Sequence, residues 1–137
     1  MILNDQPNDN PVLDYLIYSI FLADLDTGVH SLSTAIIMQE LVRYMKISET
    51  EGREMYFGAL SHDLGKTCIP RSILQKPGPL TDHERQTIKL HPQIAYHILY
   101  PISNLRSFVE IPFCHHEWWD GNGYPRGLKS LEGSANS

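Results

Sequence analysis

Apolar residues recur at three- and four-residue steps along much of the chain, which is the spacing of one face of a helix. Pro11 suits a first helical turn, so a helix is expected over residues 11–24. The clearest apolar run predicts a second helix that begins near His30. Its members are Leu32, Ala35, Met38, Val42 and Met45. No segment alternates cleanly between apolar and polar residues, as a half-buried strand would.

Two polar motifs mark further helix starts. Residues 48–51 and 81–84 each place a hydroxyl three positions before a glutamate, which is the pattern of a capping box. The first motif predicts a helix that carries the His62-Asp63 pair and stops at Gly65. The second predicts a helix towards Leu90. The other expected elements are a proline-rich loop over 69–79, a break at His91, helices over about 93–99 and 105–118, and a loop over 120–125.

These elements predict an all-α protein, a compact helical bundle formed by one domain over residues 11–129. A length of 137 residues is typical of a single domain, and 42% hydrophobic residues are enough for a packed core. Residues 1–10 are expected to form a flexible tail and residues 130–137 a disordered one.

Charge and composition narrow the function. The chain carries 11 basic and 16 acidic residues, a net charge of −5, which argues against DNA as a partner. A phosphate ligand would therefore need local positive charge, such as a metal ion. The apolar stretch over residues 16–23 is too short to cross a membrane, and residues 1–11 do not resemble a secretory signal. Cys68 and Cys114 have no CxxC spacing and are expected to be buried in a reducing cytoplasm.

Histidines carry the candidate chemistry. Seven occur, and three of them lie in two adjacent pairs of candidate ligands, His62-Asp63 and His115-His116. Imidazole and carboxylate together suit iron, manganese or zinc. With His30 and His91 arriving from other helices, six side chains can surround a pair of ions. His83 and His97 are expected to have no such role.

Lys66 follows Asp63 by three residues at a predicted helix end. Its ammonium group can contact a bound phosphate or steady the metal-binding carboxylate. The alternative is a solvated cation that complements the C-terminus of a helix. Glu117 is expected either to orient a ligating histidine or to lie exposed on a helix.

The segment over residues 62–66 resembles the HD superfamily of metal-dependent phosphohydrolases. Residues 115–128 are similar to HHExxDGxGYPxGL, the signature of its HD-GYP subfamily, and residues 74–81 and 89–92 also look like that subfamily. The resemblance covers roughly residues 24–129.

The resemblance implies an all-α bundle that holds two, sometimes three, iron or manganese ions and hydrolyses cyclic di-GMP to pGpG and GMP. Asp63 matches the bridging carboxylate and Lys66 the lysine that contacts phosphate. Asp26 matches the position of a third-metal ligand, although a cap or surface acid is the alternative. The positions that match metal ligands are His30, His62, Asp63, His91, His115 and His116. The loop residues Gly123, Tyr124 and Pro125 are implied to shape the site or to contact partners such as diguanylate cyclase (GGDEF-type) domains.

The resemblance stops after Leu128. The family continues with an aspartate that completes the metal site and with a segment that contacts phosphate, and neither follows here. We therefore expect a C-terminally incomplete HD-GYP-like domain, whose exposed apolar face can be covered in a homodimer. Two hypotheses stay open: a cyclic di-GMP phosphodiesterase, or a catalytically impaired module that binds nucleotide or a partner protein.

Overall fold

The computed structural model describes residues 10–129, and helices follow one another along most of them. Residues 1–9 of the tail predicted at 1–10, and the whole tail predicted at 130–137, lie outside the described residues. The elements are α1 (Pro11–Ala23), α2 (Leu25–Met45), α3 (Glu49–Ser61), the 3-10 helix η2 (Leu64–Cys68), α4 (Arg71–Leu74), α5 (Asp82–Ile88), α6 (His91–Leu99), the 3-10 helix η3 (Ser103–Phe108) and α7 (Glu110–Cys114). Within this part of the chain, β structure is limited to one isolated bridge between Asp120 and Lys129. The predicted all-α class is confirmed.

Polar side chains set where the first two helices begin. The Asn10 side chain accepts hydrogen bonds from the backbone N–H groups of Val12 and Leu13, so Asn10 belongs to the start of α1. Asp24 ends α1 and caps α2 through the N–H of Thr27. The prediction that the second helix begins near His30 was wrong, because the Asp24 cap starts it five residues earlier and leaves His30 inside α2.

Other helix boundaries match the prediction in part. Ser48 caps α3, and Thr81 and Glu84 form a complete capping box at α5. The proline-rich stretch expected to be loop contains the single turn of α4. The continuous helix expected over 105–118 is instead η3 followed by α7, which ends at Cys114. Pro112 explains the change, because it has no N–H to continue a helix from the preceding turn and is tolerated only near a helix start.

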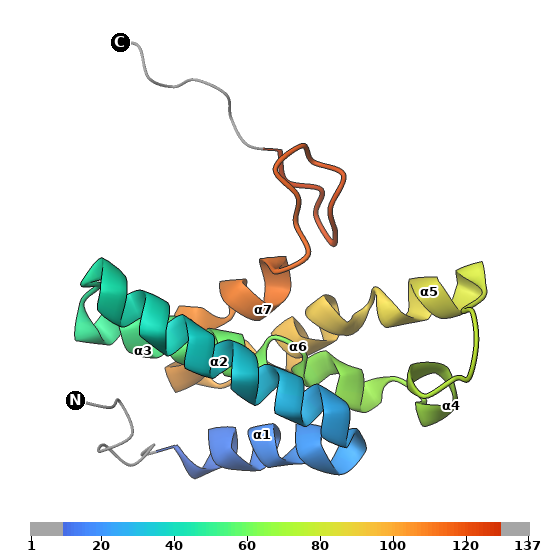
Figure 1. Ribbon diagram of the computed structural model, residues 1–137, viewed down its shortest axis with the longest axis horizontal. Coiled ribbons are helices and arrows are strands. Elements are labelled where there is room, and N and C mark those ends of the chain that lie inside the picture. The colour runs from blue at the N-terminus through green and yellow to red at the C-terminus, as the bar shows by residue number, and fades with distance from the viewer. Residues whose placement is uncertain (1–9, 130–137) are drawn as a thin grey trace.

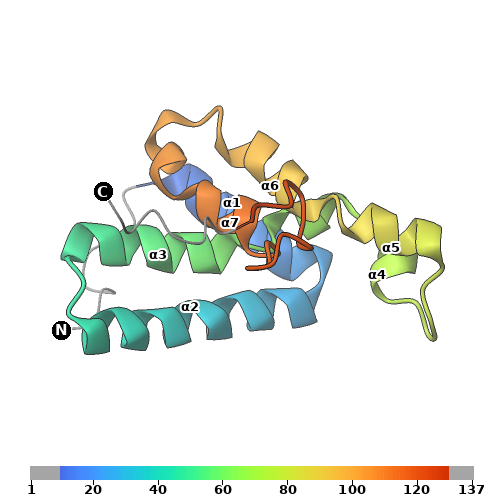
Figure 2. The same cartoon turned by 90° about the horizontal axis from the view of Figure 1, so that it is seen from above.

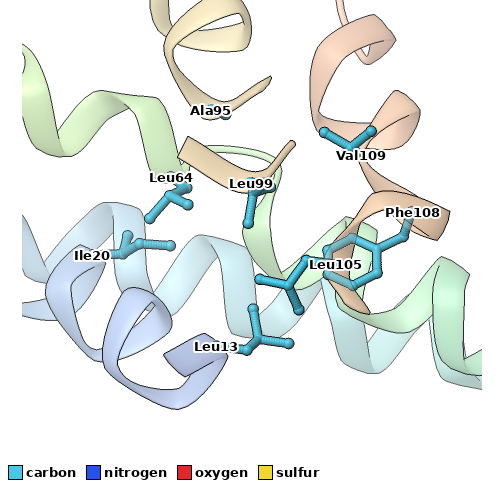
Figure 3. Close-up of a cluster of buried hydrophobic side chains, with 8 residues drawn as sticks. All are labelled: Leu13, Ile20, Leu64, Ala95, Leu99, Leu105, Phe108 and Val109. Carbon is cyan, nitrogen blue, oxygen red and sulfur yellow. The ribbon is translucent and has the colours of Figure 1, made fainter. Parts of the chain in front are cut away.

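The helices pack as a bundle with a projecting arm. Figures 1 and 2 show α2 and α3 side by side, α1 against α2, and α4 with α5 extending to one side. The main core lies where α1, η2, α6 and η3 meet (Figure 3), and its buried members are Leu13, Ile20, Leu64, Ala95, Leu99, Leu105, Phe108 and Val109. A second cluster, Ala35, Ala59 and Leu60, joins α2 to α3. Phe57 of α3 and Ile111 of α7 pack against the main core, which therefore fixes α3, η2, α6 and α7 relative to one another.

An apolar surface remains on α1 and α2. Of the predicted helical face, Ala35 and Val42 are buried, whereas Leu32 and Met45 are exposed. Exposed apolar side chains on these two helices include Tyr15, Tyr18, Leu22, Leu25, Val29, Ile36, Ile37, Leu41 and Tyr44. None of the helices in residues 10–129 combines the length and apolar character that a membrane span requires.

The cysteines differ from expectation. Cys68 is exposed and Cys114 is half-buried, so the prediction that both are buried was wrong. Both thiols are free. Cys114 lies beside Arg126, whose guanidinium nitrogen is 2.8 Å from its sulfur.

Candidate metal centre

A single buried carboxylate, that of Asp63, lies at the centre of the predicted site. Asp63 lies between His62, the C-cap of α3, and the first residue of η2, and its side chain is 3% exposed. Its Oδ2 atom lies 2.9 Å from Lys66 Nζ, 3.2 Å from His62 Nε2 and 4.0 Å from His30 Nε2. Its Oδ1 atom lies 3.3 Å from His91 Nε2 and 3.9 Å from His115 Nε2. Residues from α2, η2, α6 and the end of α7 thus converge on one carboxylate.

The candidate ligands form two groups of three. In each group the ligand atoms lie within 4.8 Å of one another, and the groups are His30, His62 and Asp63, and His91, His115 and His116. Asp63 turns one oxygen towards each group, as a carboxylate between two ions would. The structure therefore brings together all six side chains for which the sequence predicted this role.

Three of the histidines are oriented by the backbone of their own helical turn. The Nδ1–H groups of His62, His91 and His115 donate to the carbonyls of the residues three positions earlier, at 2.7, 2.7 and 2.8 Å. A carbonyl oxygen only accepts, so Nδ1 carries the proton and Nε2 is the atom that faces Asp63. Histidine ligands in metal sites commonly use the second ring nitrogen in this way.

The distance between two of these rings fits a bound cation. His91 Nε2 and His115 Nε2 are 3.2 Å apart. In their neutral forms both atoms present lone pairs, so neither can donate to the other. The two lone pairs therefore repel each other. A divalent ion bound between the two nitrogen atoms would remove this repulsion, because both lone pairs would then point at a positive charge. The donor set of imidazole nitrogen and carboxylate oxygen suits iron, manganese or zinc, so these residues fit a metal pair.

Burial and neighbouring charges shift the pKa values of the candidate ligands in opposite directions. Burial alone raises the pKa of Asp63, but its close contacts with the His62 and His91 rings and the positive charge of Lys66 hold that pKa well below its usual range. Burial tends to lower the pKa of His62, and the neighbouring Asp63 outweighs burial and raises it. Burial lowers the pKa of His115 to about 3. Asp63 is therefore ionised and His115 is neutral, which are the forms that bind metal.

Not every candidate lies in the two groups. Asp26 is exposed in the first turn of α2 and belongs to neither. His83 and His97 also lie outside both. His30 is the most open member, with a side chain 61% exposed.

The loop that follows α7 folds back onto the site, and residues 115–129 stand above the bundle in Figure 1. The Tyr124 ring stacks on the His116 ring, with centroids 4.6 Å apart and planes 17° apart. The Glu117 carboxylate accepts the backbone N–H groups of Arg126 and Leu128, each at 2.7 Å. Both oxygens of the Glu117 carboxylate thus bind the loop backbone, and neither accepts a hydrogen bond from a candidate histidine ligand among the described residues. Neither backbone contact was predicted. The sequence did contain a signal for them: Glu117 precedes a glycine-rich loop, and the backbone N–H groups of such a loop need hydrogen-bond acceptors.

The chain is similar in sequence to several known proteins. A family model described as HD domain matches residues 20–134. A cyclic di-GMP phosphodiesterase of Thermotoga maritima is 40% identical over 111 residues, which cover 80% of this chain and 30% of that protein. The cyclic di-GMP phosphodiesterase response regulator RpfG of Xanthomonas campestris pv. campestris is 44% identical over 86 residues, or 60% of this chain and 22% of that protein.

A third relative carries a different substrate in its name. The 3'3'-cGAMP-specific phosphodiesterase 3 of Vibrio cholerae is 34% identical over 106 residues, which cover 77% of this chain and 23% of that protein. The chain spans less than a third of the length of these three relatives.

Proposed function

The chain belongs to the HD domain family, and from that premise we propose that it forms a metal-dependent phosphodiesterase that hydrolyses cyclic di-GMP to pGpG and GMP. The observation that carries the proposal is the position of Asp63, with one oxygen towards each of two ligand groups. A carboxylate placed in this way can hold two ions close together, as phosphodiester hydrolysis by a metal pair requires. Similarity to cyclic di-GMP phosphodiesterases over most of the chain supports the choice of substrate.

We propose two divalent ions, iron or manganese, as the cofactors. When bound, such a pair supplies an activated water and neutralises the oxygens of the phosphate. His30, His62 and Asp63 would hold one ion, and His91 with the His115-His116 pair the other. For a third ion, Asp26 is the proposed ligand, since it lies four residues before His30 on α2 and so shares a face with it.

Lys66 is the proposed catalytic partner of Asp63. Its ammonium group donates to Asp63 Oδ2 at 2.9 Å, which holds the carboxylate in its ionised form. The Lys66 side chain is 25% exposed, so the same group can also contact a substrate phosphate. A positive charge there stabilises the negative charge that develops as the P–O bond breaks. This charge also helps a protein of net charge −5 to hold an anionic substrate.

The substrate test compares two cyclic dinucleotides. We expect protein loaded with manganese, or with iron under anaerobic conditions, to release pGpG and GMP from cyclic di-GMP, detected by chromatography. A second candidate is 3'3'-cGAMP, which is favoured by three relatives named for it. No product above the metal-free control from either compound would contradict the proposal. Nucleotide binding by calorimetry without turnover would instead support the impaired binding module.

Partners and location follow from the same premise. The loop with Gly123, Tyr124 and Pro125 is the proposed contact for a diguanylate cyclase (GGDEF-type) domain, supported by the exposure of the adjacent Trp118 and Trp119.

A homodimer through α1 and α2 is supported by their exposed apolar side chains. A cytoplasmic location is supported by the two free thiols. Light scattering coupled to size exclusion tests the dimer, and a monomer at high concentration would contradict it.

A further inference from the structure

His116 is oriented differently from the three histidines held by backbone carbonyls. Among the described residues, its ring makes no hydrogen bond. It contacts other rings instead: it lies 4.2 Å from His115 and 5.1 Å from His91, measured between ring centroids. Its one stacked neighbour is Tyr124, at 4.6 Å and 17°. The plane of the His116 ring is therefore set by the face of the tyrosine.

Tyr124 is itself held firmly. Its backbone N–H donates to the carbonyl of His116 at 3.0 Å, which places the tyrosine beside the ring on which it stacks. Gly123 makes this approach possible, because a β-carbon there would overlap the backbone of Glu117 and its neighbours. The ammonium group of Lys89 lies 5.3 Å from the centroid of the Tyr124 ring, within range of a cation–π contact.

We propose that Tyr124 is a positioning residue for His116, and that stacking on its ring sets the metal affinity of the group formed by His91, His115 and His116. A ligand ring that is free to rotate loses conformational freedom when it binds an ion, which weakens binding. A ring already stacked in place loses little. Residues that orient metal ligands by hydrogen bonding typically change metal affinity about 10–100-fold when they are replaced. We expect a stacked ring that orients a ligand to act on the same scale. The inference rests on the proposed metal centre and goes beyond it.

The test uses calorimetric titration of the metal-free full chain with Mn²⁺. In Tyr124→Leu, which removes the aromatic face, we expect one of two metal equivalents to bind at least about 10-fold more weakly while the other is unchanged. Tyr124→Phe keeps the stacking face and should bind both as the wild type does. The matched control is Tyr100→Leu, because Tyr100 stacks on Tyr96 at 5.0 Å and 17° with Arg106 over its ring at 5.0 Å, yet touches no candidate ligand.

Two results would overturn the inference. One is a folded Tyr124→Leu protein that binds both equivalents as tightly as the wild type. The other is Tyr124→Phe binding as weakly as Tyr124→Leu, which would assign the effect to the hydroxyl group. By contrast, a wild-type protein that binds no Mn²⁺ and hydrolyses no cyclic dinucleotide would remove the proposed function itself.

A second measurement does not depend on the folding of the leucine variant. Wild-type protein that contains fluorotyrosine is loaded with Co²⁺, and the fluorine resonance of Tyr124 is assigned by its absence from Tyr124→Phe. Stacking on a metal ligand predicts that this resonance is shifted and broadened by the paramagnetic ion, whereas that of Tyr100 is not. An unshifted Tyr124 resonance in the Co²⁺-loaded protein would overturn the inference.

Discussion

The α-carbon of Gly65 lies directly against the main-chain carbonyl of His91. A β-carbon on Gly65 would overlap this carbonyl, and a backbone atom cannot move aside as a flexible side chain can. η2 and α6 therefore meet backbone to backbone, which places the carboxylate of Asp63 within 3.3 Å of His91 Nε2. Gly65 was predicted to stop a helix, but it lies inside η2, and its small size is what the structure uses.

Gly65→Ala should separate the two halves of the site. Overpacking of a close contact costs about 1–3 kcal/mol, so we expect the free energy of unfolding to fall by that amount and metal binding to weaken. Denaturant unfolding and metal titration measure the two effects. The control is Gly28→Ala on α2, where the three atoms nearest to an added β-carbon all belong to the side chain of Phe21 and none to the backbone. Unchanged stability and metal binding in Gly65→Ala would contradict this account of the contact.

Asp63→Asn should remove metal from both groups. The amide keeps the shape of the side chain but loses the negative charge that both groups share, and a buried neutral oxygen is a weak ligand for divalent ions. Elemental analysis of the purified variant should show loss of both equivalents, with hydrolysis falling to the level of the metal-free protein. His83→Gln, which alters a histidine outside both groups, serves as the control. Two ions retained in Asp63→Asn would show that the carboxylate is not shared.

Lys66→Met should lower turnover and leave the metal in place. The substitution removes the ammonium group that donates to Asp63 but removes no candidate ligand. We expect kcat/KM for cyclic di-GMP to fall about 100-fold, as on loss of one group that stabilises charge in a transition state. Lys46→Met, at the far end of α2 from His30, is the matched control. Steady-state kinetics measures the loss of turnover, and metal analysis shows whether the ions are retained. A variant as active as the wild type would remove Lys66 from the mechanism.

The stability of the metal-free protein should be greatest near pH 6.5. Below that pH, His115 is protonated in the unfolded chain but stays neutral in the folded protein, because burial lowers its pKa to about 3. Stability is therefore lost as the pH falls from 6.5 towards 3. The pKa of His62 is raised, so its contribution is fully present below pH 6.5 and is lost as the pH rises through the raised value.

Urea midpoints in the presence of a chelator, at about pH 4.5, 6.5 and 8.5, measure this dependence. His115→Gln should reduce the loss of stability on the acid side and leave the alkaline side unchanged. Equal midpoints for the wild type at the two lower pH values would contradict the assigned origin of the shift.

Helix starts were predictable where a polar side chain signals them. Ser48 and Thr81 cap the helices that their motifs predicted. The start of α2 was missed because Asp24 follows the end of α1 with no loop between the two helices, so the apolar pattern was assigned to the wrong first turn. The end of α7 was missed because the apolar run hides the effect of Pro112 on the helix before it.

The composition of the site was predictable, and its geometry was not. The adjacent pairs His62-Asp63 and His115-His116 marked the ligand set, and the structure groups them with His30 and His91. No local pattern in the sequence indicates that one oxygen of Asp63 faces each group, since this depends on the packing of η2 against α6. The stacking of Tyr124 on His116 likewise depends on how the loop folds back.

Because His62, His91 and His115 are tied to carbonyls of their own helical turns, their lone pairs keep one direction whether or not an ion has arrived. The proposed metal centre is thus a rigid template, whose ligand geometry would not adjust to the ion that binds. A rigid template discriminates by ionic radius and preferred coordination number. If the centre holds iron or manganese as proposed, exchange of Fe²⁺ for Mn²⁺, which differ little in either respect, would require no refolding, and the supply of each ion in the cell would decide which of the two is bound.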